Sequence, residues 1–95
     1  MNKVQMHETI CKELNDVYVK KNHDYGDSFN DTFDKLGLIS AVTRIMDKCN
    51  RLASLATLPE EKRKVKDESI SDTLLDMANY CILTEMKLRM NKDKN

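Results

Sequence analysis

Residues that turn the chain are scarce in this sequence, which has two glycines and one proline among its 95 residues. A β-sandwich or barrel needs a turn about every ten residues, and glycine and proline supply many of those turns. A chain of this length also supports one hydrophobic core and not two. We therefore expect an all-α, three-helix fold with a single domain over residues 1–95.

Apolar residues recur at helical spacing in three segments of the chain. The pattern predicts helices over Asn2–Lys21, Leu38–Leu58 and Asp67–Met90. The segment Asn22–Gly37 breaks the pattern and contains both glycines. We expect it to form an ordered loop, which Phe29 and Phe33 hold against the helices.

Pro59 is predicted to end the second helix, because proline cannot continue a helical hydrogen-bond pattern. The charged segment Glu60–Lys66 then reads as a solvated connection. Asp67 or a neighbour is a candidate cap for the third helix, since acidic residues in a first turn suit the helix dipole.

The predicted third helix is apolar over about half of its circumference. Such a helix needs cover on two sides, and two short neighbouring helices supply little of it. We therefore expect a homo-oligomer, a dimer or higher. The apolar residues form two groups, Ile70, Leu74, Met77, Cys81 and Leu88 in one and Leu75, Ala78, Ile82 and Met86 in the other.

Sixteen basic and sixteen acidic residues give a formal net charge of zero. Non-specific binding to duplex DNA or to an acidic membrane relies on excess positive charge, so neither is expected. No stretch resembles a signal peptide or a membrane span, and we expect a cytoplasmic protein.

The three cysteines, Cys11, Cys49 and Cys81, are far apart in the sequence. In a cytoplasmic protein they are expected to be reduced. Cys49 and Cys81 lie within apolar stripes, where a free cysteine acts as a small buried hydrophobic residue. A zinc site is not favoured, since the chain has no Cys-x-x-Cys pair.

An acidic stripe is the clearest chemical feature of the predicted third helix. Glu68, Asp72 and Asp76 recur every four residues, and Asn79 follows one turn later. Like charges at this spacing repel each other, and a divalent cation such as Mg²⁺ relieves the repulsion. The alternatives are a solvated acidic face, or ion pairs with basic residues of the second helix.

The predicted second helix carries the complementary charges. Arg44, Lys48 and Arg51 surround Asp47 on one side of it. If this side faces the acidic stripe, the basic residues can hold phosphates while the carboxylates hold a metal ion. On spacing alone, a solvated face with pairs such as Asp47 and Arg51 is the more common outcome.

The segment between the first two helices holds a third candidate group, formed by His23, Asp24 and Tyr25. Tyr25 is able to stack on a base, and Gly26 permits close approach of the backbone. A structural turn stabilised by aspartate and asparagine side chains is the alternative.

Three blocks of the sequence resemble one known family. They are Lys21-Asn22-His23-Asp24-Tyr25-Gly26-Asp27-Ser28-Phe29, then Arg44-Ile45-Met46-Asp47-Lys48 with Arg51-Leu52, then Glu68-Ser69-Ile70-Ser71-Asp72-Thr73-Leu74-Leu75-Asp76-Met77-Ala78-Asn79-Tyr80. The chain is similar to the nucleotide modification associated domain 1 family, a small helical domain common in bacteriophages and their hosts. The resemblance implies a phage or prophage setting in a bacterial host cell and a link to nucleotide metabolism. It does not assign an activity.

A more distant similarity is to the MazG-like all-α nucleoside triphosphate pyrophosphatases. Those enzymes hold Mg²⁺ with an E-x-x-E pair on one helix and an E-x-x-D pair on the next. Here Asp47 matches the first acid, but Asn50 stands where the second belongs. Glu68 and Asp72 are four residues apart instead of three.

The similarity to the MazG-like enzymes implies a nucleotide-binding helical oligomer with Mg²⁺. The activity that it suggests is hydrolysis of a (deoxy)nucleoside triphosphate. In this interpretation Asp47, Glu68 and Asp72 hold the metal, and Asp76 joins them or orients the attacking water. The nucleotide is then bound by His23, Asp24, Tyr25, Arg44, Lys48, Arg51 and Asn79. Two alternatives are a protein that sequesters a nucleotide without hydrolysis and a helical protein-interaction module.

Overall fold

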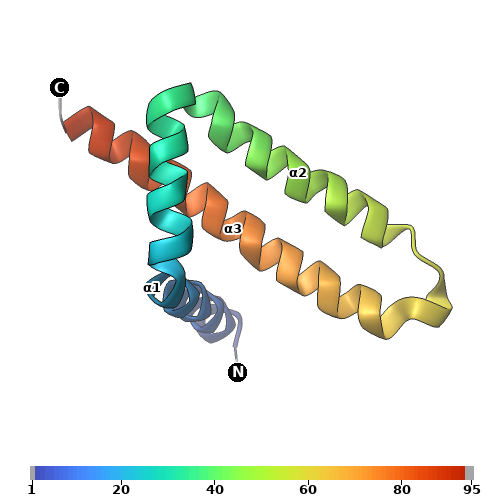
Figure 1. Cartoon of the computed structure of the whole chain (residues 1–95). Helices are drawn as coiled ribbons and strands as arrows, with labels where there is room; N and C mark the ends of the chain where they lie inside the picture. The colour runs from blue at the N-terminus through green and yellow to red at the C-terminus, as the bar shows by residue number, and fades with distance from the viewer. Residues whose placement is uncertain (1, 94–95) are drawn as a thin grey trace.

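The computed structural model of the chain describes residues 2–93, without the side chains of residues 23–26 and 63–65. Over this range it contains helices and no strand, so the all-α prediction is confirmed. Three long helices, α1 (Lys3–Leu36), α2 (Leu38–Ala56) and α3 (Arg63–Asp93), are joined by short turns, and the 3₁₀ turn η1 (Glu60–Lys62) precedes α3. Figure 1 shows α2 and α3 as an antiparallel hairpin that α1 crosses near the open end.

Helix α1 begins with a reciprocal pair of hydrogen bonds. The side chain of Asn2 accepts from the backbone N–H of Gln5 at 2.8 Å, and the Gln5 side chain accepts from the backbone N–H of Asn2 at 3.0 Å. Two of the N–H groups that a helix leaves unpaired at its start are satisfied in this way.

The loop predicted over Asn22–Gly37 was wrong, because α1 continues through this segment to Leu36. Phe29 and Phe33 are one helical turn apart and both are buried. Their packing requires helical spacing, and tertiary packing of this kind overrides weak helix propensity. Between α1 and α2 the chain turns at Gly37, whose φ of 80° lies in the left-handed region that favours glycine.

The boundaries of the other two helices differ more modestly from the sequence prediction. Helix α2 ends at Ala56, just before Thr57 and Leu58. Helix α3 begins at Arg63, so Asp67 lies inside the helix and is not its cap. The expected connection over Glu60–Lys66 is therefore largely helical.

One aromatic cluster joins all three helices. Phe29 and Phe33 of α1 pack with Ala41 of α2 and Leu83 of α3, and Tyr18 and Tyr80 lie against this group. The ring centroids of Phe29 and Tyr80 are 6.2 Å apart and the rings are stacked. Burying large aromatic side chains supplies much of the stability of so small a core.

An ion pair with a buried lysine and an exposed aspartate reinforces the same junction. The Lys87 side chain of α3 is 3% exposed, and its Nζ lies 2.7 Å from Oδ1 of Asp34 in α1. Because a buried ammonium group is costly without a partner, this contact fixes the end of α1 against α3.

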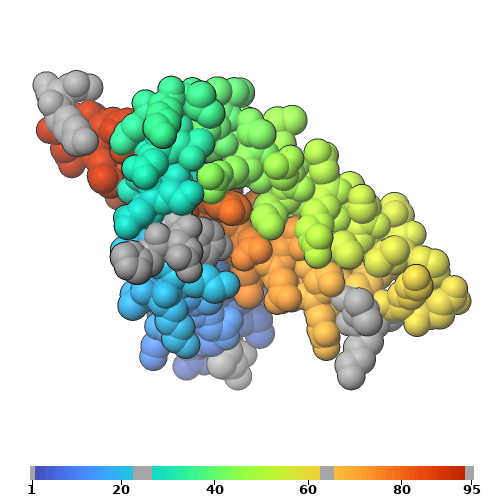
Figure 2. All heavy atoms as spheres, in the orientation of Figure 1, coloured from blue at the N-terminus to red at the C-terminus, as the bar shows by residue number. Residues whose placement is uncertain are grey.

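The core leaves much apolar surface uncovered. The accessible surface is 7229 Å², whereas a compact folded monomer of this mass exposes about 5,600 Å². The radius of gyration is 15.4 Å, against about 12 Å for a compact domain of this length. In Figure 2 the hairpin of α2 and α3 extends well beyond α1.

Helix α2 carries a continuous apolar stripe on its exposed side. The stripe residues alternate by three and four positions, as in a helix that packs on another helix. They are all exposed, and are Ile39, Val42, Met46, Cys49, Ala53 and Ala56. Leu74, Cys81 and Leu88 of α3 are exposed as well. This surface supports the expectation that copies of the chain associate.

The burial predicted for the cysteines was wrong for the chain by itself, since all three are free and exposed. The thiol of Cys49 donates to Sδ of Met77 at 3.6 Å, at the margin of the α2–α3 contact. The stripes that contain Cys49 and Cys81 are wider than the surface that neighbouring helices cover. The expectation of reduced thiols remains a prediction.

Light scattering is expected to give a mass at least twice that of the 11.0 kDa chain, because the exposed stripe needs cover. Met46→Lys or Ile82→Lys should dissociate the assembly. Thr9→Lys adds the same charge at an exposed polar position of α1 and should leave the mass unchanged. A wild-type mass of one chain at micromolar concentration would contradict this prediction.

Thiol reactivity gives a second measure of the same surface. In a variant that retains Cys49 alone, Ellman's reagent should react more slowly with the assembled protein than with its Met46→Lys form, because an interface shields the thiol. Equal rates in the two forms would show that the α2 stripe is not the contact.

Candidate functional site

A cleft of about 350 Å³ lies between α1 and α3. Three of the predicted site residues, Asp72, Asp76 and Asn79, line one wall from successive turns of α3. The opposite wall belongs to residues 13–21 of α1, which had not been predicted to take part. The complete lining is Glu13, Leu14, Val17, Lys21, Asp72, Leu75, Asp76 and Asn79.

The cleft combines apolar surface with charge. Leu14, Val17 and Leu75 provide the apolar part. Three carboxylates and one lysine make up the charged part, so the lining carries an excess of negative charge. Such a site attracts cations, and an anionic ligand needs a cation to enter it.

Asn79 lies at the buried side of this cleft and is 5% exposed. Its Nδ2 donates to the backbone oxygen of Leu14 at 3.5 Å, which ties α3 to α1. Its amide oxygen accepts no hydrogen bond from the described residues. Because no fully buried side-chain oxygen or nitrogen in the described part lacks a partner, this oxygen keeps access to solvent.

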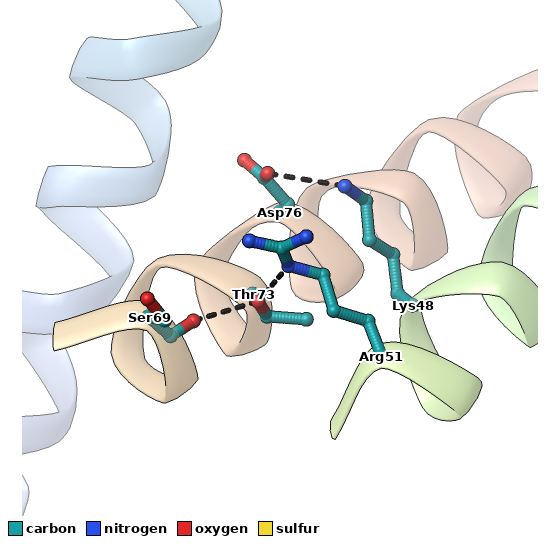
Figure 3. Close-up of polar contacts among 5 residues, drawn as sticks. All are labelled: Lys48, Arg51, Ser69, Thr73 and Asp76. Carbon is teal, nitrogen blue, oxygen red and sulfur yellow. Dashed lines mark hydrogen bonds and ion pairs between the residues drawn. The ribbon is translucent and has the colours of Figure 1, made fainter. Parts of the chain in front are cut away.

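The basic residues of α2 face α3, which is one of the arrangements that the sequence left open. Lys48 Nζ lies 3.4 Å from Oδ2 of Asp76, and Arg51 Nε donates to Oγ1 of Thr73 at 3.2 Å. Figure 3 shows both side chains reaching across from α2 to the same face of α3. The charged face and the acidic stripe therefore meet, at the positions of Lys48 and Asp76.

Thr73 is the buried centre of this contact and is 2% exposed. Its hydroxyl accepts from Arg51 and donates to the backbone oxygen of Ser69 at 2.6 Å (Figure 3). A hydroxyl that accepts and donates at once fixes the arginine in one position. Thr73 was not predicted from the sequence, because spacing along one helix does not show which of its polar residues a neighbouring helix contacts.

Arg44 contacts an aromatic pair. Its guanidinium carbon lies 5.8 Å from the ring centroids of both Phe29 and Tyr80. Cation–π contacts of this kind contribute about 0.5–1 kcal/mol each at exposed sites. Arg44 does not line the cleft, and its role as a phosphate ligand stays a prediction.

The remaining predicted residues are not gathered at the cleft. Asp47 and Glu68 are exposed and do not line it. Among the side chains that the structure describes, no three His, Cys, Asp or Glu are close enough to hold one metal ion. Asp47, Glu68 and Asp72 therefore do not form a preformed triad in the single chain. The side chains of His23, Asp24 and Tyr25 lie outside the described residues.

Glu13 and Lys21 are the cleft residues that sequence reasoning did not single out. They bracket Val17 at intervals of four residues, so all three lie on one face of α1. Two opposite charges around an apolar position are a recognisable pattern. The pattern does not show which helix this face meets.

The two aspartates of the cleft should respond differently to neutralisation. Asp72→Asn removes the repulsion from Asp76 one turn away, so the metal-free protein should gain up to about 0.5 kcal/mol. Asp76→Asn removes the same repulsion but also the contact with Lys48, so no gain is expected. Urea denaturation followed by circular dichroism measures both. A clear loss of stability in Asp72→Asn would show an additional structural role for its carboxylate.

A protein-family model described as nucleotide modification associated domain 1 matches residues 21–88 of the chain. Comparisons with curated proteins and with solved structures found no match. Among the described residues, no helix is long and apolar enough to cross a membrane. The family match covers more than half of the chain, including the α3 wall of the cleft and Lys21 of the α1 wall. The chain belongs to the nucleotide modification associated domain 1 family.

Proposed function

We propose that this protein is a homo-oligomer that binds a nucleotide together with Mg²⁺ in the cleft between α1 and α3. The observation that carries the proposal is the convergence of Asp72, Asp76 and Asn79 on one wall of a cleft of suitable size. Small-molecule sites have volumes of about 300–1,000 Å³. The volume of about 350 Å³ is enough for part of a nucleotide.

The donor set fits Mg²⁺. This ion retains several waters and takes one or two carboxylates together with substrate phosphates. Asp72 and Asp76 are one turn apart on α3 and offer two carboxylates. A preformed group of three acidic side chains is therefore not required. The bound cation supplies the positive charge that an anionic nucleotide needs in a negatively charged cleft.

Other residues of the lining suit the rest of the ligand. Leu14, Val17 and Leu75 offer apolar surface to a base or a sugar. Lys21 offers an ammonium group at the α1 wall. The family description links this domain to nucleotide modification, which supports a nucleotide over other phosphorylated compounds.

Hydrolysis of a nucleoside triphosphate between the α- and β-phosphates is the second candidate function. It is favoured by a third carboxylate, Glu13, which lines the wall opposite Asp72 and Asp76. In this case Asp76 would orient the attacking water, and a cation held at Asp72 would supply a positive charge for the phosphate. A protein that sequesters the nucleotide uses the same cleft and returns its ligand intact.

A protein-interaction module is the third candidate function. It is favoured by the exposed apolar stripe of α2, which a partner of another sequence would cover as well as a second copy does. A protein of this kind is expected to bind neither Mg²⁺ nor nucleotide.

A thermal-shift screen of nucleotides with and without Mg²⁺ tests the proposed function. At a concentration of 100 times its Kd, a ligand stabilises the folded state by about 2.7 kcal/mol, which raises the melting temperature by several degrees. Asp72→Asn should abolish the Mg²⁺-dependent part of the shift. Glu68→Gln is the matched control, since Glu68 belongs to the same acidic stripe but does not line the cleft.

Chromatography of the ligand after incubation separates the candidates. Released pyrophosphate indicates hydrolysis, and an intact nucleotide indicates binding alone. If no nucleotide changes the melting temperature of the wild type, with or without Mg²⁺, the proposed function is wrong and the interaction module takes its place. Equal losses in Asp72→Asn and Glu68→Gln would instead place the metal outside the cleft.

A further inference from the structure

Two lysine–aspartate contacts between helices differ in burial and in length. Lys87 is almost fully buried, and its Nζ lies 2.7 Å from Asp34. The Lys48 side chain is 26% exposed, and its Nζ lies 3.4 Å from Asp76. Charge-assisted hydrogen bonds are shorter, at about 2.7–2.9 Å. Lys87 is therefore held tightly, whereas Lys48 makes a loose contact that is easily exchanged.

Asp76 is shared between this contact and the cleft. Its carboxylate lies against Lys48, and Asp76 also lines the cleft with Asp72 one turn earlier. Lys48 does not line the cleft. The ammonium group thus offsets the repulsion between two aspartates from a position next to Asp76, at the edge of the space that a ligand would occupy.

A second observation, independent of the acidic residues, indicates that this wall receives a cation. Asn79 is only 5% exposed, and it lines the cleft one turn beyond Asp76. Its Nδ2 is used by Leu14. Its oxygen accepts no hydrogen bond from the described residues and keeps solvent access. Amide and carboxylate oxygens together are a donor set typical of hard cations, and this wall of the cleft carries one amide and two carboxylates.

We propose that Lys48 is a built-in counter-ion, which neutralises Asp76 while the cleft is empty and is displaced when Mg²⁺ binds. The released ammonium group is then available to a phosphate of the nucleotide. This inference rests on the proposed function, because it concerns regulation of the same cleft. Charge is balanced throughout, since the metal replaces the lysine at the aspartates and the phosphate replaces the aspartate at the lysine.

The proposal predicts two effects of opposite sign for Lys48→Met. Without the competing ammonium group, Mg²⁺ alone should bind about two- to fivefold more tightly, which corresponds to the usual strength of a half-exposed ion pair. The Mg²⁺–nucleotide complex should bind about tenfold more weakly, because a hydrogen bond between charged groups is lost. Isothermal titration calorimetry measures both affinities.

Three further variants make the test specific. Lys48→Arg keeps the charge and should stay within about twofold of the wild type in both titrations. Lys48→Gln removes the charge but keeps a polar side chain, and should repeat the two effects of Lys48→Met if that variant does not fold. Arg89→Met removes one positive charge from an exposed pair with Glu85 near the end of α3, and should change neither affinity.

The outcomes separate this inference from the proposed function. If the wild type binds Mg²⁺ and nucleotide but Lys48→Met weakens both or changes neither, the counter-ion role is wrong and the proposed function stands. If the wild type binds neither Mg²⁺ nor any nucleotide, the proposed function fails and the inference fails with it. Opposite changes in the two affinities, absent from Arg89→Met, support the counter-ion role.

Discussion

The packing of Phe29 against Tyr80 and Leu83 is the contact on which the rest of the structure depends. Phe29 is 2% exposed and belongs to a core of few buried hydrophobic residues. The same cluster brings Ala41 of α2 against Leu83 of α3. Since the described part of the chain has no second core of comparable size, this cluster sets the position of all three helices.

The register of the α2–α3 hairpin follows from this starting point. From Ala41 and Leu83, each turn forward along α2 meets one turn backward along α3. Arg44 thus lies at Tyr80, Lys48 at Asp76 and Arg51 at Thr73. An aromatic contact, an ion pair and a hydrogen bond succeed one another along a single seam. A shift by one turn would place each of these side chains opposite a different partner.

The same arrangement creates the cleft and also leaves the molecule incomplete. Because α1 crosses the hairpin instead of lying along it (Figure 1), it covers only part of α2 and α3. The cleft lies between α1 and α3, and the outer side of α2 remains without cover. Association of chains would compensate for this missing cover.

The sequence by itself determined the helical class, the apolar faces and the spacing of the acidic stripe. Helical periodicity states which side chains share a face, so the spacing of Asp72, Asp76 and Asn79 was enough to group them. It could not show that α1 continues through Asn22–Gly37, because the burial of Phe29 and Phe33 depends on residues far along the chain. Over this segment the packing of the two phenylalanines outweighs the weak local helix propensity.

Only the tertiary structure decided which faces meet. The pairing of Lys48 with Asp76, the contact of Arg51 with the buried Thr73, and the entry of Glu13 and Lys21 into the cleft all join separate helices. Spacing along one helix fixes directions around its own axis and carries no information on the crossing angle or the register of a neighbour. Those two quantities come from the packing of the aromatic cluster, which therefore places each charge at its partner.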